Sequence, residues 1–375
     1  IACNSTLGLM EIEAVRARFG LNLFKLILLL SIFYMTIFLI AEVTAVSILI
    51  NYISGTNLWI TSLTIILSSL IYTLYGGLRA SIFTDNIQFI IFGILLLIVF
   101  SYMISLNGNV FSFEYIKLNK PELLSMNYLP NFTAGLTFFI AVAATNLFHQ
   151  GNWQRVYAAK NNNVLIHSLI VSFIIILPIV FLMGFTGLIS VSKNPSVYPD
   201  LAFFSLLLKE NVWTMSFIIL LLSISLTVSS IDTLINAISS LIIVDGDKVL
   251  KIKGDYLIYS KYFIFFLSLI AFIVASYGLS ILYLFLLADL LCCAAVLTVF
   301  YSFYDKKIKE KNAYISIIIG LFTGLLLFPS PDFSKSILIG VLFPTSAFPS
   351  FMSESLLFLS FLFATFFPIL TWKTK

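Results

Sequence analysis

Long runs of apolar residues recur along the whole chain and decide what it can fold into. The run from Val212 to Val244 contains one ionisable residue, Asp232, and is longer than the roughly 20 residues that a helix needs to cross a bilayer. Backbone amides and carbonyls find no water inside a bilayer, so such runs cross it as helices. The sequence therefore predicts an all-α membrane protein.

About ten stretches have the length and composition of transmembrane helices. They lie near residues 22–50, 57–75, 83–105, 131–150, 163–190, 212–243, 260–277, 280–303, 313–329 and 354–371. The apolar stretch from Ser336 to Phe348 is too short to cross and contains Pro344, which predicts an interfacial or re-entrant segment.

Lys and Arg are distributed unevenly between alternate loops. The loops of one side contain only Lys117, Lys120, Lys193, Lys209 and Lys335, and the other side holds the remaining 16 of the 21 basic residues. Basic residues collect on the cytoplasmic side of membrane proteins. We therefore expect a multi-pass protein of the cell membrane with both termini in the cytoplasm and the lipid bilayer around its helices.

The composition excludes several classes of function. Charged residues make up 10% of the chain, against about 25% in soluble domains. The net charge of +4 is small and dispersed, which argues against nucleic acid as a partner. His149 and His167 have no cysteine nearby, so we expect no metal cluster of the zinc type. With no phosphate loop and no nucleophile paired with a base, we expect neither an enzyme nor an organic cofactor.

A serine pair, Ser229 and Ser230, precedes Asp232 inside one of the predicted spans. Hydroxyl groups at consecutive positions point about 100° apart around a helix, so both reach one ion only near a helix end or break. The alternative is that serine hydroxyls join neighbouring membrane helices or bond to their own backbone. Asp232, Glu42 and Asp289 are either buried hydrogen-bonded groups or parts of an ion pathway.

A second polar group follows the second span, in the sequence YTLYGGLRASIFTDNIQF. Gly76 and Gly77 permit a sharp chain reversal, and Arg79 places this loop inside. Asp85 then begins the third span, where a carboxylate either caps the helix or lies on an ion pathway.

This segment resembles the sodium:solute symporter family, which includes sodium/glucose, sodium/proline and urea cotransporters. Three further stretches resemble the family in its own order: RARFG at Arg16–Gly20, HQGNWQRVYAAK at His149–Lys160, and LTVSSIDTLINA. They match the loop before the third core helix, the segment that closes the sixth, and the eighth core helix. The resemblance covers the first eight spans, as core helices three to ten.

The resemblance implies a core of two inverted five-helix repeats, with substrate and sodium near the midplane beside broken helices. One transmembrane domain then spans residues 1–375, with a cytoplasmic segment at 1–21, core helices at 22–303 and accessory helices at 304–375. In the family, two core helices precede the loop that Arg16–Gly20 matches. We therefore expect a chain that lacks its first two core helices and does not transport as it stands.

The resemblance also implies which residues bind sodium, a hard cation that prefers oxygen ligands. Carried over, the ligands are the hydroxyls of Ser229 and Ser230 and the carbonyl of Leu226. Asp85 matches the family's aspartate implicated in cation coupling. A hydroxyl that some members place at the Leu226 position for a second sodium is absent here.

The candidate substrate-binding residues are the polar ones near the end of the sixth core helix, namely Thr145, Asn146, His149 and Gln150. The family's sugar transporters have an aromatic pair where Thr145 and Asn146 stand, which argues against a hexose. The expected function is a secondary active transporter that couples inward sodium movement to uptake of a small polar solute by alternating access. The alternative is a membrane sensor module of a signalling protein with the same fold.

The uneven charge distribution makes the orientation testable. A Lys117→Cys protein should react with an impermeant thiol reagent added outside intact cells, because Lys117 lies in a predicted external loop. A Lys307→Cys protein, the internal control, should react only after permeabilisation. The reverse labelling pattern would refute the orientation.

Overall fold

The computed structural model describes residues 11–105, 113–208, 212–250, 255–305, 307–333, 336, 338–339 and 355–372. The described residues are almost entirely helical, with one isolated bridge between Pro329 and Ser336. Most of the predicted re-entrant stretch, Ser336 to Phe348, lies outside the described residues.

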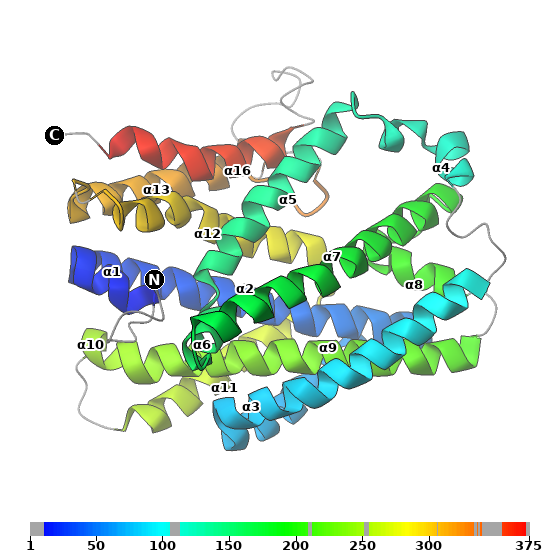
Figure 1. Cartoon of the computed structure of the whole chain (residues 1–375), viewed down its shortest axis with the longest axis horizontal. Helices are drawn as coiled ribbons and strands as arrows, with labels where there is room; N and C mark the ends of the chain where they lie inside the picture. The colour runs from blue at the N-terminus through cyan, green and yellow to red at the C-terminus, as the bar shows by residue number, and fades with distance from the viewer. Residues whose placement is uncertain are drawn as a thin grey trace.

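The helices follow one another without any sheet between them in the described ranges (Figure 1). In chain order they are α1 (Glu11–Phe19), α2 (Leu21–Ser54), α3 (Leu58–Ser105), α4 (Glu114–Asn119), η3 (Pro121–Leu124), α5 (Leu129–Phe148), α6 (Gln150–Ala158), α7 (Asn162–Lys193), η4 (Pro199–Leu201), α8 (Ala202–Leu207), α9 (Val212–Ser240), η5 (Leu241–Asp245), α10 (Gly246–Leu250), α11 (Tyr256–Ala275), α12 (Ile281–Ser302), α13 (Glu310–Leu327), α16 (Leu356–Phe366) and η7 (Phe367–Thr371).

Eight helices in the described part of the chain are long and apolar enough to cross a membrane. Two shorter apolar helices, Leu58–Ile71 and Leu356–Thr371, correspond to the second and tenth expected spans. The fold class predicted from the sequence, an all-α polytopic membrane protein with about ten transmembrane helices, is therefore confirmed.

The expected second and third spans belong to one helical element, the 48-residue α3. A straight helix of this length would measure about 72 Å. Yet the Ser62 hydroxyl in the first half of α3 hydrogen-bonds to the Ser47 hydroxyl of α2, at 2.9 Å between the two oxygens. Val99 in the second half packs in the same apolar cluster as Leu49, which is also on α2. The two halves therefore lie side by side, and the chain reverses between them, in the region where the glycine pair predicted a reversal.

Helices α2, α9 and α12 form the centre of the bundle. Helix α2 packs against both α9 and α12, and α3 packs along α9. Figure 1 shows α5 running obliquely to these helices, and it contacts α12 and α16. One buried apolar cluster extends through these elements from α1 to α16, so the helices that carry the polar candidates are held by a common core.

The apolar side chains outside this core are exposed over long stretches of helix. Helix α7 has almost none of its membrane-length stretch buried, and on α9 Trp213, Phe217 and Leu221 are exposed. Exposed apolar side chains on helices of this length are suited to lipid contact.

Two glycines allow α13 to approach its neighbours closely. A Cβ added at Gly320 would lie 2.7 Å from the Ala364 carbonyl oxygen, and one at Gly324 would lie 2.8 Å from the Ala364 Cβ. Ser360 also donates to the Gly324 carbonyl at 2.7 Å. The spacing of these glycines is the small-xxx-small pattern that brings membrane helices together.

This contact predicts that Gly320→Ala destabilises the protein even though alanine favours a helix. The clash with backbone at Ala364 cannot relax by a side-chain rotation, and overpacking of this kind costs about 1–3 kcal/mol. The matched control is Gly135→Ala in α5, where nothing lies within 4 Å of the added Cβ. The measurement is the thermal unfolding midpoint of the purified protein, and equal midpoints for the two variants would contradict the close approach.

Candidate functional site

Helix α9 directs its serine pair toward two different neighbours. Ser229 donates to a carboxylate oxygen of Asp85 on α3 at 2.5 Å, whereas the Ser230 hydroxyl faces the carboxylate of Glu42 on α2. The helix continues unbroken from Val212 to Ser240, so consecutive side chains diverge by about 100°. The divergence expected from the sequence is present, and the helix break that would unite the two hydroxyls is not.

Leu226 lies on an exposed face of the same helix, with 40% of its side chain accessible. In an unbroken helix its carbonyl accepts the amide of Ser230. A carbonyl oxygen has a second lone pair, so this group keeps the capacity to bind one further donor or cation.

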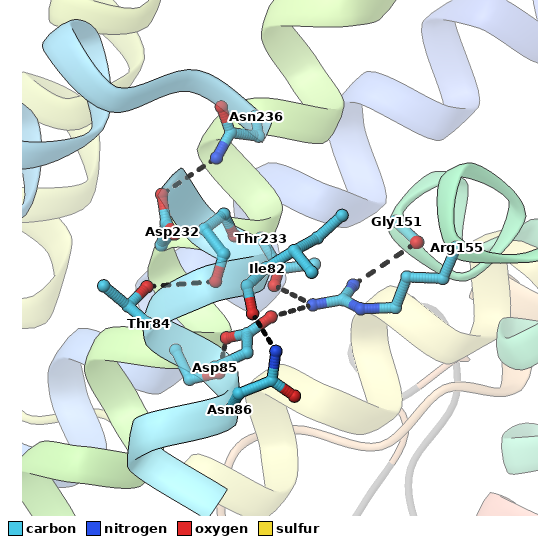
Figure 2. Close-up of polar contacts among 11 residues, drawn as sticks. Ile82, Thr84, Asp85, Asn86, Gly151, Arg155, Asp232, Thr233 and Asn236 are labelled. Atoms are coloured by element: carbon cyan, nitrogen blue, oxygen red, sulfur yellow. Dashed lines mark hydrogen bonds and ion pairs between the residues drawn. The ribbon is translucent and has the colours of Figure 1, made fainter. Parts of the chain in front are cut away.

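Asp85 connects three helices. Its carboxylate accepts the Ser229 hydroxyl of α9 and forms an ion pair with Arg155 of α6 at 2.6 Å (Figure 2). The helix-capping interpretation expects the Asp85 carboxylate to accept backbone amides at the start of its own span. The carboxylate is bonded to other helices instead.

Arg155 completes this cluster. Besides Asp85, its guanidinium donates to the Thr233 hydroxyl at 2.9 Å and to the Gly151 carbonyl at 3.3 Å. Figure 2 shows the guanidinium pointing toward both Asp85 and Thr233. Gly151 allows this approach, since a Cβ there would lie 2.5 Å from the Thr233 methyl group.

The sequence reasoning missed Thr233, although a signal was available. Thr233 follows Ser229 by four residues and so lies on the same face of α9. Arg155 lies in the stretch His149–Lys160 that resembles the family, and its ion pair with Asp85 follows from the fold.

A helix break lies between α5 and α6, at His149. This residue has an extended backbone, with φ −72° and ψ 102°, and it separates the two helices. Carbonyls near the break bond to side chains: Phe148 accepts the Tyr34 hydroxyl at 2.9 Å, and Leu147 accepts the Trp153 indole at 2.7 Å. Side chains therefore satisfy backbone groups that a continuous helix would have used.

The four candidate substrate residues lie around this break but have different neighbours. Thr145 is buried and donates to Asp289 of α12 at 2.6 Å, while Asn146 is exposed and accepts from Asn152. The His149 ring packs against Tyr34, and Gln150 is fully buried. Thr145 and Gln150 are therefore buried on opposite sides of the break, whereas Asn146 is exposed.

Within the described residues, no group of three or more His, Cys, Asp or Glu side chains is arranged to hold a metal ion. The polar groups around Ser229, Ser230 and Thr233 include hydroxyls, single carboxylates and one guanidinium. Such oxygen atoms are suited to hard cations and not to thiolate-bound or imidazole-bound metals.

The bundle of membrane-length helices, with a broken helix beside buried polar groups, defines a polytopic membrane protein of the transporter type. Comparison with known sequences gives the family. The model of the Sodium:solute symporter family matches residues 6–320. The chain belongs to this family, as the resemblance of its motifs indicated.

Individual relatives are more distant. The chain is 27% identical over 302 residues to the spermidine transporter DUR31 of Candida albicans, a match that covers 80% of this chain and 56% of that protein. It is 22% identical over 370 residues to the mouse sodium/myo-inositol cotransporter 2, covering 84% of this chain and 54% of the relative. The chain thus spans about half the length of the curated relatives it matches.

The fold is similar to that of a solved Na⁺-coupled sialic acid symporter in a substrate-bound, outward-open state. The TM-score is 0.64 at 16% identity, and the match covers 96% of this chain and 77% of the other. This likeness establishes the arrangement of the helices.

The ion pair between Asp85 and Arg155 predicts a non-additive effect of mutation. Asp85→Asn should lower the thermal unfolding midpoint, because Arg155 loses its ionic partner. Arg155→Gln should lower the free energy of unfolding by less in the Asp85→Asn protein than in the wild type. The coupling energy of the two substitutions should be about 0.5–3 kcal/mol. Strictly additive shifts in the double-mutant cycle would show that the pair contributes no coupling.

Proposed function

We propose that this protein couples inward movement of sodium to uptake of a small polar solute by alternating access. The observation that carries the proposal is the bond between Ser229 and Asp85. This bond places the hydroxyl of Ser229 beside the carboxylate of Asp85. Ser229 lies on the helix that binds sodium in the family, and Asp85 is the residue that the family resemblance connects with cation coupling. Membership of the family supports sodium as the coupling ion.

The proposed sodium ligands are the hydroxyls of Ser229 and Ser230 and the carbonyl of Leu226, with Asp85 as the counter charge. Hydroxyl and carbonyl oxygens bind a hard cation without adding a full charge to the membrane interior. Arg155 already neutralises Asp85. A sodium ion beside Ser229 would therefore compete with the guanidinium for the same carboxylate. That competition would weaken the ion pair that joins α6 to α3.

The proposed solute position is the break at His149, with Thr145, Asn146 and Gln150 as the other candidate contacts. The break is supported by the separate ends of α5 and α6. Because α6 also carries Arg155, an ion at α9 and a solute at the break would act on the same short helix. This shared element is the structural basis that we propose for coupling.

The relatives differ in the solutes that their names give, which are a polyamine in one and a polyol in the other. We therefore propose the solute only as a small polar molecule. The orientation, with both termini in the cytoplasm, rests on the distribution of Lys and Arg.

The function is tested by uptake into proteoliposomes that contain the complete protein. Radiolabelled urea, amino acids, polyamines, polyols, sugars and carboxylates are offered with an inward sodium gradient and, as the control, with an equal choline gradient. Sodium-dependent accumulation of at least one solute supports the proposal. Equal uptake of each solute under both gradients would refute sodium coupling.

The serine pair predicts a specific loss of sodium dependence. Ser229→Ala together with Ser230→Ala removes two oxygen ligands while both residues stay small, so sodium dependence should fall more than stability does. The matched control is Ser216→Ala with Ser225→Ala on the same helix, whose hydroxyls have no hydrogen-bond partner among the described residues. An unchanged sodium dependence in the first variant would place the ion elsewhere.

A further inference from the structure

A cleft lies between the first turns of α2 and α13 and shares no lining residue with the sites proposed above. Its volume is about 600 Å³, and its polar lining consists of Asn22 and Lys25 of α2 with Glu310, Lys311 and Tyr314 of α13. Glu310 joins the two helices here, because its Oε1 accepts the backbone amide of Asn22 at 3.0 Å and that of the next residue at 3.2 Å. Both helices therefore start at the same end of the bundle, and they pack against each other.

Two lysines of this lining lie in the first two turns of their helices. Lys25 and Lys311 are exposed, and neither ammonium group forms an ion pair within the described part of the chain. The acidic residue of the lining, Glu310, is held at the first amides of α2, where the positive end of the helix dipole offsets its charge. This end of the cleft therefore has an excess of positive charge that is open to a ligand.

Apolar side chains continue the cleft one turn further along both helices. Leu29 follows Lys25 by four residues and so lies on the same face of α2. The same spacing separates Ile315 from Lys311 on α13. Tyr314 stands between these two residues of α13 and is exposed, as is typical of tyrosines at a membrane interface. A ligand that matches this lining is anionic at one end and apolar along its length.

We propose that this cleft binds an anionic phospholipid of the cytoplasmic leaflet. Its phosphate would lie between the ammonium groups of Lys25 and Lys311, and an acyl chain would lie along Leu29 and Ile315. The distribution of Lys and Arg predicts that this end of both helices is cytoplasmic, and basic pockets between membrane helices on that side are suited to anionic head groups. The inference rests on the proposed orientation and not on the coupling ion.

A lipid accounts for the whole lining, whereas a soluble anion accounts only for the lysines. Leu29 and Ile315 are exposed side chains on two helices of membrane length, so the apolar part of the cleft is suited to hydrocarbon. A free phosphate would leave this part uncovered. The bound lipid would also contact both helices and so reinforce the joint that Glu310 makes between them.

The inference is tested by native mass spectrometry of the complete protein in detergent, with phosphatidylglycerol and phosphatidylcholine of identical acyl chains as the probes. The wild type should bind phosphatidylglycerol about tenfold more tightly, as expected for two lysines beside an anionic group. Lys25→Gln with Lys311→Gln should remove most of this preference. The matched control is Lys160→Gln with Lys307→Gln, which removes two exposed lysines of the same predicted side that do not line the cleft.

A second pair of variants tests the position of the acyl chain. Ile315→Trp fills the apolar part of the cleft without changing its charge, and should weaken the binding of phosphatidylglycerol. The control is Ile318→Trp on the same helix, because Ile315 and Ile318 are both 41% exposed and only Ile315 lines the cleft.

Three results would overturn the inference. The first is equal binding of the two lipids by the wild type, and the second is an equal loss of preference in the two lysine double variants. The third is unchanged binding in the Ile315→Trp protein. Glycerol 3-phosphate serves as a soluble probe, and if it binds as tightly as phosphatidylglycerol, the site takes a free phosphate and the lipid is the wrong ligand. Because these measurements involve no sodium gradient, their failure would leave sodium coupling unaffected.

Discussion

The ion pair between Asp85 and Arg155 is the interaction on which the polar centre of this bundle depends. A carboxylate placed among membrane helices is costly unless it has a partner, and Asp85 obtains partners from two other helices at once. Its two oxygens therefore fix α3 against both α6 and α9. The lack of a side chain at Gly151 permits the same geometry, because it lets α6 approach the Thr233 methyl group.

The position of Arg155 also relates the ion to the solute in the proposed mechanism. Helix α6 is short and is separated from α5 by the break at His149. A cation bound beside Asp85 would weaken the ion pair between Asp85 and Arg155, since the cation and the guanidinium compete for one negative charge. The free energy of ion binding would then act on the helix that borders the proposed solute position. Reciprocal coupling between the two ligands follows from such a shared element.

The sequence predicted what depends on local composition. The length of the apolar runs indicated the helices, and Gly76 with Gly77 indicated the reversal inside α3. The sequence could not predict which helices the polar residues would meet. Asp85 was open to a capping interpretation because its partners, Ser229 and Arg155, are distant in the chain.

Some features could have been found from spacing alone. Thr233 shares a face of α9 with Ser229 by the four-residue rule, and Gly320 with Gly324 has the spacing of a close helix contact. The ion pair of Asp85 with Arg155 could not have been found in this way, because the two residues are 70 positions apart in the chain. Their distance in sequence makes the juxtaposition a property of the fold.

The unbroken course of α9 constrains how coupling can work. Ser229 and Ser230 are consecutive residues, and a regular helix turns consecutive side chains about 100° apart, toward different neighbours. They face Asp85 on α3 and Glu42 on α2, respectively. An ion bound at either position therefore bridges α9 to another helix. In the proposed mechanism ion binding then acts through the relative positions of whole helices, since α9 itself has no local unwinding that could respond to the ion.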